Sequence, residues 1–130
     1  MFNIIDTAAS GVSVHRKWLD AVSDNMANIN NVAPTSGNAF QERFVVAKEL
    51  PTHNGTVVSQ VLSGDKTGRM VYEPTHPLAD AGGYVKYPDI DLSEQMGYLI
   101  MAQRGYQANI AAVERATSAY QAALNLGKNA

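Results

Sequence analysis

Apolar residues recur with a seven-residue period at both ends of this 130-residue chain. In the first segment, two rows set three positions apart contain Ile5, Val12, Leu19 and Met26, and Ala8, His15, Val22 and Ile29. Near the C-terminus, two rows set four positions apart contain Leu92, Leu99, Tyr106, Val113 and Tyr120, and Met96, Gln103, Ile110, Thr117 and Leu124. Rows with this period are typical of helices that bury a narrow stripe against other helices. The pattern predicts two long amphipathic helices, one at each end.

The prolines of the chain all lie between these periodic segments, at Pro34, Pro51, Pro74, Pro77 and Pro88. Because proline stops or kinks a helix, this distribution predicts a helix, an irregular middle and a second helix. Asp91 is placed to cap the second helix, and Glu94 three residues later completes a capping box. From Leu92 to Gly127 this helix would extend about 54 Å. A compact globule of this length has a diameter of only about 36 Å, so we expect an elongated molecule.

The middle of the chain contains short runs that favour β-strands. Residues 44–47 and 56–62 are rich in valine, a turn-forming Asn54-Gly55 precedes the second run, and residues 69–73 are a third candidate. The predicted fold is mainly α with a small β appendage, in which two long terminal helices pair as a coiled-coil-like hairpin and a short β-hairpin domain is inserted between them. Its parts are an N-terminal helix within residues 1–33, a β-rich insert and extended linker within 34–90, and a C-terminal helix within 91–130.

Composition excludes several functional classes. The formal net charge is −2 and like charges form no long run, so the sequence shows neither a nucleic-acid footprint nor a basic membrane-binding face. The absence of cysteine excludes disulfides and thiolate metal sites. The N-terminus lacks a basic region followed by a long apolar run, so we expect no cleavable secretory signal. No stretch approaches the roughly 20 apolar residues of a membrane span.

Residues that could carry chemistry form no recognisable site. The histidines lie in different segments without ligand-like spacing: His15, His53 and His76. His15 lies in an apolar row, so we interpret it as a packed helix contact, and we expect the other two in loops. The acidic group of Asp89, Asp91 and Glu94 lacks the spacing of a calcium loop and suits a helix start, where carboxylates offset the helix dipole. No nucleophile elbow or zinc-binding helix motif is present. We therefore predict no enzymatic activity, no cofactor and no metal.

Two paired helices cannot cover all of their own apolar surface, so neighbouring molecules should cover the rest. Because helices gain most of their stability from packing, we predict a monomer that is partly unfolded or frayed and that orders on assembly. Trp18, the single tryptophan, lies beside the first stripe and is interpreted as an interface anchor. Polar residues on or beside the C-terminal rows form either a solvated face or, as a group, determinants of register and partner: Gln103, Arg104, Gln107, Asn109 and Arg115.

Several groups of residues resemble the flagellar axial proteins of the bacterial rod and hook. The N-terminal signature consists of Ala9-Ser10-Gly11, Leu19 and Asn25-Met26-Ala27-Asn28. A longer likeness, to the proximal-rod subunits of this family, covers residues 73–80 (EPTHPLAD) and 83–91 (GYVKYPDID). It continues through Glu94-Gln95-Met96 and residues 102–109 (AQRGYQAN), whereas residues 40–68 match the family only in pattern.

This resemblance implies a structural subunit of the flagellar basal-body rod. The terminal helices would form the inner α-helical domain of a tubular rod, with the small β-rich domain outside it. The subunit would polymerise through these helices into the periplasm-spanning drive shaft that transmits torque to the hook. The resemblance also implies export by the flagellar type III apparatus, self-association, contact with other rod subunits and contact with the basal-body adaptor at the export gate. Nucleic acid and direct membrane insertion are not implied.

The resemblance, together with the heptads, directs the choice of site residues. Those expected to pack helices and support assembly are Val12, Leu19, Val22, Met26, Leu99, Tyr106, Ile110 and Val113. Those expected to set subunit register and contacts are Asn25, Asn28, Gln107 and Asn109. The main alternative is a soluble helical adaptor or regulator that binds one partner without polymerising, and a small enzyme is a third interpretation. An adaptor would account for the heptads equally well, but not for the likeness of residues 84–91 and 104–109.

Overall fold

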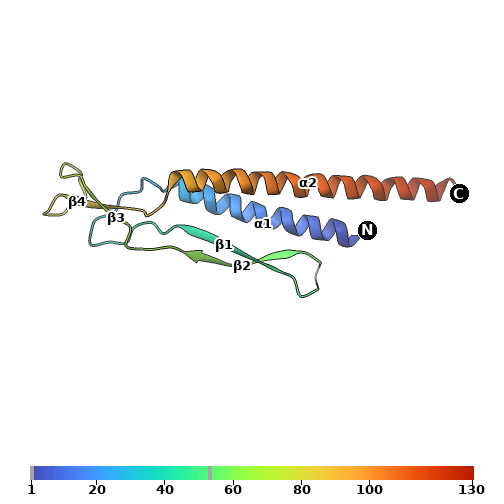
Figure 1. Cartoon of the computed structure of the whole chain (residues 1–130), viewed down its shortest axis with the longest axis horizontal. Coiled ribbons are helices and arrows are strands. Elements are labelled where there is room, and N and C mark those ends of the chain that lie inside the picture. The colour runs from blue at the N-terminus through green and yellow to red at the C-terminus, as the bar shows by residue number, and fades with distance from the viewer. Residues whose placement is uncertain (1, 53) are drawn as a thin grey trace.

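The computed structural model describes residues 2–52 and 54–130, apart from the side chain of Phe2. Its elements follow the order α1 (Phe2–Ala27), β1 (Arg43–Glu49), β2 (Thr56–Ser63), β3 (Arg69–Tyr72), β4 (Tyr84–Tyr87) and α2 (Leu92–Lys128). Figure 1 shows an elongated molecule in which the two helices lie side by side. The predicted mainly α fold with a small β appendage is confirmed. His53, which was expected in a loop, lies outside the described residues.

Polar side chains cap the two helices where they face the β-rich end. The Asp91 carboxylate accepts a hydrogen bond from the Glu94 N–H at 2.9 Å, so the predicted N-cap of α2 is confirmed. At the end of α1, after Ala27, the Asn28 side-chain amide donates to the Asp24 carbonyl at 2.8 Å. The same carbonyl accepts the Asn28 backbone N–H at 3.1 Å, so Asn28 supplies both donors to a carbonyl at the helix end.

The helices run antiparallel, and small or polar side chains line their contact. The α2 residues that face α1 recur every seven positions, at Gln95, Ala102, Asn109 and Ala116. In the predicted row one position further on, Met96, Gln103, Thr117 and Leu124 are exposed and only Ile110 is half-buried. The correction has a steric reason: alanine and short amides let two helix backbones approach more closely than methionine or leucine would.

The β-rich region consists of two hairpins, not the single hairpin predicted. β1 pairs antiparallel with β2, with a bulge between Val46 and Ala47, and β3 pairs antiparallel with β4. Residues 84–87, which form β4, were expected to be an extended approach to the second helix. The β1–β2 hairpin lies along α1 (Figure 1) and is fixed there by the Thr56 N–H, which donates to the Ser10 hydroxyl at 3.0 Å.

The buried core is small. Of the buried hydrophobic residues in the described part of the chain, only Val22, Val85 and Ile90 are larger than alanine. The molecule exposes 8400 Å², whereas a compact monomer of its 14.0 kDa mass exposes about 6,700 Å². The chain therefore leaves much more surface exposed than a protein that is complete as a monomer.

Candidate assembly interface

A buried polar cluster joins the end of α1, the start of α2 and the start of β1. Asn25, 1% exposed, donates to the Gln95 side-chain oxygen at 3.1 Å and to the Arg43 carbonyl at 3.0 Å. Its own oxygen accepts from the Arg43 N–H at 2.8 Å. Gln95 is fully buried and donates its amide to the Glu42 carboxylate. We call these four residues the polar lock. It satisfies every group it buries, and its bonds fix how α1, α2 and β1 meet.

Charges at the edge of the polar lock add to this arrangement. Asp24 forms an ion pair with Arg43, and both side chains are about half exposed, so the pair contributes little stability by itself. Burial raises the pKa of the Glu42 carboxyl, the hydrogen bond from Gln95 lowers it, and the nearby Glu94 raises it again. The net shift is upward. Keeping the Glu42 carboxylate ionised therefore costs free energy in the folded state.

At the other end of the helix pair, two glycines allow close contact. A Cβ at Gly105 would lie 2.2 Å from the His15 ring nitrogen Nε2, and one at Gly11 would lie 2.5 Å from the Asn109 side-chain oxygen. Each helix therefore presents a glycine to a polar side chain of the other. The Nδ1 atom of His15 lies 2.7 Å from the Gly11 carbonyl and 3.3 Å from the Asn109 side-chain nitrogen. His15 is a packed helix contact, as its place in the heptad indicated.

These two contact regions hold the helices in a single register. Asn25 faces Gln95 and Gly11 faces Asn109, and both contacts lie two heptads apart on each helix. Sliding one helix along the other would break the amide bonds and bring a side chain against the site of a glycine. Sequence reasoning identified Asn25 and Asn109 but missed Gln95 and the glycines. The signal was present, as a heptad row of small and amide residues beside the apolar row.

The structure distributes the other predicted site residues over the helix pair. Val22 is buried, and the remaining predicted packing residues are half-buried: Val12, Leu19, Met26, Leu99, Tyr106, Ile110 and Val113. Val12, Ile110 and Val113 line an apolar hollow of about 250 Å³ between the helices. Asn28 caps α1, while Gln107 is exposed on α2. Asn25 and Asn109 make their contacts within one chain, and the predicted role of all these residues between subunits stays a prediction.

Trp18 lies at the rim of a second hollow. Its ring packs between those of His15 and Tyr98, with centroid distances of 6.2 and 6.1 Å. The hollow, of about 340 Å³, separates α1 from the β1–β2 hairpin, and no charged side chain of the described residues lines it: Val14, His15, Trp18, Val45, Ala47 and Thr56. An apolar surface of this kind fits the predicted anchor role of Trp18.

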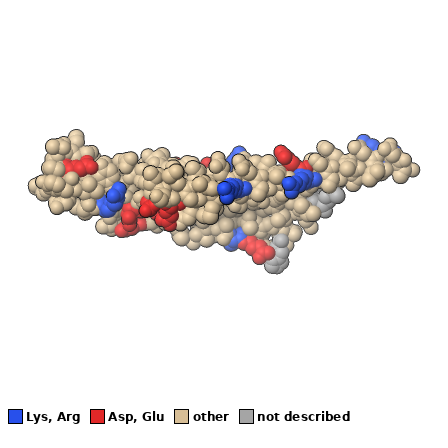
Figure 2. Space-filling model, turned by 45° about the horizontal axis from the view of Figure 1, so that its top comes forward, with Lys and Arg blue, Asp and Glu red and all other residues tan. Residues whose placement is uncertain are grey.

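The outer surface is apolar at both ends of α2. Leu92, Met96, Ile100 and Met101 are about half exposed at its start, and Leu124 and Leu126 are 48% and 74% exposed at its end. Figure 2 shows acidic residues gathered left of centre on this face, whereas the narrow end at the right carries only one basic group. Residues 116–127 contain no charged side chain. Exposed apolar patches on this scale mark surfaces that other proteins cover.

The described residues contain no group of three or more histidine and carboxylate side chains that could hold a metal ion. None of their helices combines the length and apolarity required to cross a membrane.

Comparison with known proteins extends these observations. A family model described as "Flagellar basal body rod FlgEFG protein C-terminal" matches residues 81–126. The flagellar basal-body rod protein FlgC of Salmonella typhimurium is 34% identical over 132 aligned residues, which cover 98% of each chain. FlgC of Yersinia enterocolitica shows the same identity and coverage, and FlgC of Bacillus subtilis is 27% identical over 98% of each chain.

Proposed function

The chain belongs to the FlgC family of flagellar basal-body rod proteins, a structural family and not an enzyme family, and from this we propose how it works in the rod. The subunit polymerises through its two terminal helices into the periplasm-spanning drive shaft that transmits torque to the hook. Its location is the rod of the flagellar basal body, which it reaches through the type III export apparatus. Its partners are copies of itself, other rod subunits and the basal-body adaptor at the export gate.

The observation that carries the proposal is the unpartnered surface of the helix pair. The exposed area exceeds that of a compact monomer of this mass by about 1,700 Å², and the excess includes large apolar side chains at both ends of α2. A stable protein–protein interface buries about 1,600 Å² in total, or about 800 Å² on each partner, so the excess on this one chain corresponds to about two such contacts. Contacts with neighbouring subunits would therefore remove the excess.

The internal contacts support a mechanical role. A shaft under torque requires subunits whose elements do not slip past one another. The polar lock and the two glycine contacts fix the register of α1 and α2 at positions two heptads apart, and the lock also holds β1. Tight internal register leaves the deformation to the surfaces between subunits, where the apolar patches lie.

A gene deletion in the source bacterium tests the proposal. Swimming and electron microscopy of basal bodies are scored in the deletion strain and after return of the gene on a plasmid. Loss of motility with no rod or hook beyond the membrane ring, restored by the gene, is the expected result. Swimming cells with complete basal bodies would refute the structural role.

Hydrogen exchange on dilute purified protein separates the rod subunit from the adaptor alternative. A subunit that waits for its neighbours should rapidly exchange the amides in the last turns of α2 beyond Tyr120, where every side chain is exposed. A non-polymerising adaptor should protect both terminal helices fully as a monomer or dimer. Full protection at micromolar concentration would contradict the proposed coupling of helix order to assembly.

A further inference from the structure

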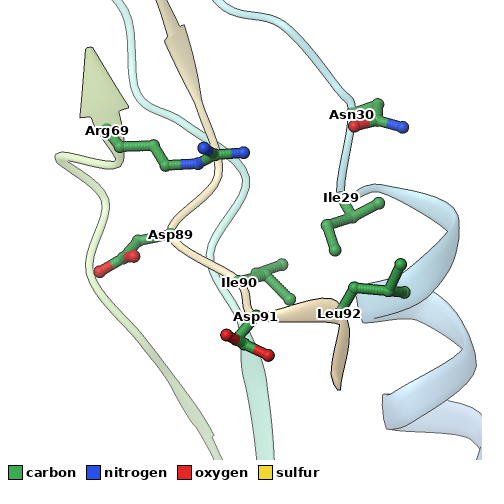
Figure 3. Close-up of a pocket in the computed structure, with 7 residues that line it drawn as sticks. All are labelled: Ile29, Asn30, Arg69, Asp89, Ile90, Asp91 and Leu92. Atoms are coloured by element: carbon green, nitrogen blue, oxygen red, sulfur yellow. The ribbon is translucent and has the colours of Figure 1, made fainter. Parts of the chain in front are cut away.

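A pocket of about 420 Å³ lies where the helix pair meets the β3–β4 hairpin, and we call it the end pocket. Residues that follow α1, begin β3 and begin α2 line it: Ile29, Asn30, Arg69, Asp89, Ile90, Asp91 and Leu92. In Figure 3 the side chains of Ile29, Ile90 and Leu92 gather around one space, and the Arg69 guanidinium reaches toward that space from the opposite wall. The end pocket thus combines an apolar floor with a cation at its rim.

Arg69 has unused hydrogen-bonding capacity. Its guanidinium packs over the Tyr87 ring at 5.6 Å, and it forms no hydrogen bond or ion pair with any described residue. A guanidinium offers five N–H donors and no acceptor. An occupant of the end pocket should therefore bring acceptor atoms to Arg69 and apolar side chains to Ile29 and Leu92, the latter 49% exposed.

The C-terminal end of an α-helix has this chemistry. Its last carbonyls have no partner within the helix and together carry a partial negative charge. When the last turns also carry leucines, one segment offers both acceptors and apolar surface. A basic residue in the last turn, common at helix C-termini, would be attracted by Asp89 and Asp91, which also line the pocket.

This chain shows what such a helix end looks like. The residues of α2 beyond Tyr120 are all exposed, and Figure 1 shows this end of the helix running past the start of α1. Leu124 and Leu126 are exposed there, Lys128 is the only charged helical residue after Arg115, and a single cap bond, from the Asn129 N–H to the Leu126 carbonyl, is present. The end pocket lies toward the opposite end of the long axis.

We propose that the end pocket receives the C-terminal helix end of a neighbouring rod subunit that carries the same C-terminal segment. The inference rests on the proposed function. The matched family model, residues 81–126, is named for the C-terminal part of other rod-class proteins, so the helix is a shared part of the assembly. Arg69 binds the last carbonyls, and Ile29 and Leu92 cover the terminal leucines. A contact between two different ends of the molecule does not close on itself, so it extends a structure along the axis.

Photo-crosslinking in assembled basal bodies identifies the occupant. A benzoylphenylalanine replaces Asn30, which is exposed at the pocket wall, in the full-length chain expressed in the deletion strain. Mass spectrometry is expected to find the adduct on the C-terminal helix end of a rod subunit. The same probe at the exposed loop residue Asn38 is the control and should not label that segment. An adduct on an N-terminal helix, a β domain or a protein outside the rod would overturn the proposal, as would no adduct.

Charge reversal at Arg69 provides an independent test. Arg69→Glu should lower the Asn30 adduct by about tenfold or more, because like charges then face each other, and should impair motility. Arg69→Lys should retain part of both. Lys66→Glu, an equal charge change on the preceding loop, should leave both unchanged. If the Arg69→Glu strain forms complete rods with unchanged adducts while the deletion strain forms no rods, the proposed occupant of the end pocket is refuted but the structural role is not. Complete rods in the deletion strain would refute the role itself.

Discussion

Replacing Asn25 should destabilise the chain more than any other single amide change in the described residues, because three polar groups depend on it. Its side chain satisfies the N–H and the carbonyl of Arg43 and the oxygen of Gln95, at 2.8 to 3.1 Å. The residue is 1% exposed, so water does not replace these bonds without a structural change. Asn25→Ala leaves all three groups without their partner and opens a small cavity.

The magnitude follows from the cost of unsatisfied polar groups. Each buried donor or acceptor that loses its partner costs about 1–3 kcal/mol, less where water enters the cavity. For three groups with partial water entry we expect a loss of about 3 kcal/mol. A domain of this size has a free energy of unfolding of about 5–15 kcal/mol, so the loss is a large fraction of the total.

Asn25→Asp tests the electrostatic part of the argument. The introduced carboxylate still accepts from the Arg43 N–H, but it faces the Arg43 carbonyl and the Gln95 oxygen, with Glu42 nearby. Its pKa in the folded state should rise above the unfolded value of about 3.9. The charged form therefore costs stability as the pH rises through the folded pKa, and the protonated form, which can donate, removes that cost below the unfolded pKa.

Urea unfolding followed by circular dichroism measures these effects. At neutral pH Asn25→Asp should be at least as unstable as Asn25→Ala, and near pH 4 it should be the more stable of the two. Asn38→Ala, at an exposed loop amide, is the control and should stay within about 0.5 kcal/mol of the wild type. An Asn25→Ala variant as stable as this control, or an unchanged order of the two variants in acid, would refute the reasoning.

Three further predictions concern the lock, the helix contact and assembly. Glu42→Gln keeps an acceptor for Gln95 but removes a carboxyl with a raised pKa, so it should raise the urea midpoint at neutral pH. The difference from wild type should vanish below pH 4.5, the ordinary pKa of the group, where the wild-type carboxyl is also neutral. Gly105→Val places branched carbons against the His15 ring and should lower stability by about 1–3 kcal/mol; a neutral result in thermal unfolding would argue against the close approach. Leu99→Glu should abolish motility by burying an unpaired carboxylate in the packed stripe. Export of the variant is the control, and normal swimming would contradict the packing assignment.

The pattern of apolar and polar positions was sufficient to predict the two helices. Heptad rows at both ends and the confinement of proline to the middle determine helix, insert and helix, because these signals act within a few turns of chain. Asp91 as the N-cap of α2 was predictable for the same reason, since a cap depends only on the residues that follow it. The elongated shape followed from helix length alone.

The β4 strand could not be predicted from local sequence signals alone. Tyr84–Tyr87 is only four residues long and follows Gly82-Gly83, so the sequence reads equally well as an extended linker. Its strand character comes from pairing with β3 and from the bridge between Ala33 and Lys86. These partners lie far away in sequence, and a two-stranded sheet depends on such pairing more than on propensity.

The features of the candidate assembly interface were likewise determined partly by the sequence and partly by the tertiary structure. The sequence by itself determined that each terminal helix has an apolar stripe and that the chain holds no recognisable catalytic constellation. Only the tertiary structure decided which row of α2 meets α1, because the large residues of one row and the small and amide residues of the next both repeat every seven positions. Asn109 opposite Gly11 and Gln95 bonded to Asn25 select the second row, since only there do the backbones approach closely enough for amides and glycines to meet. The larger side chains that this choice leaves outside form the exposed apolar surface of the helix pair.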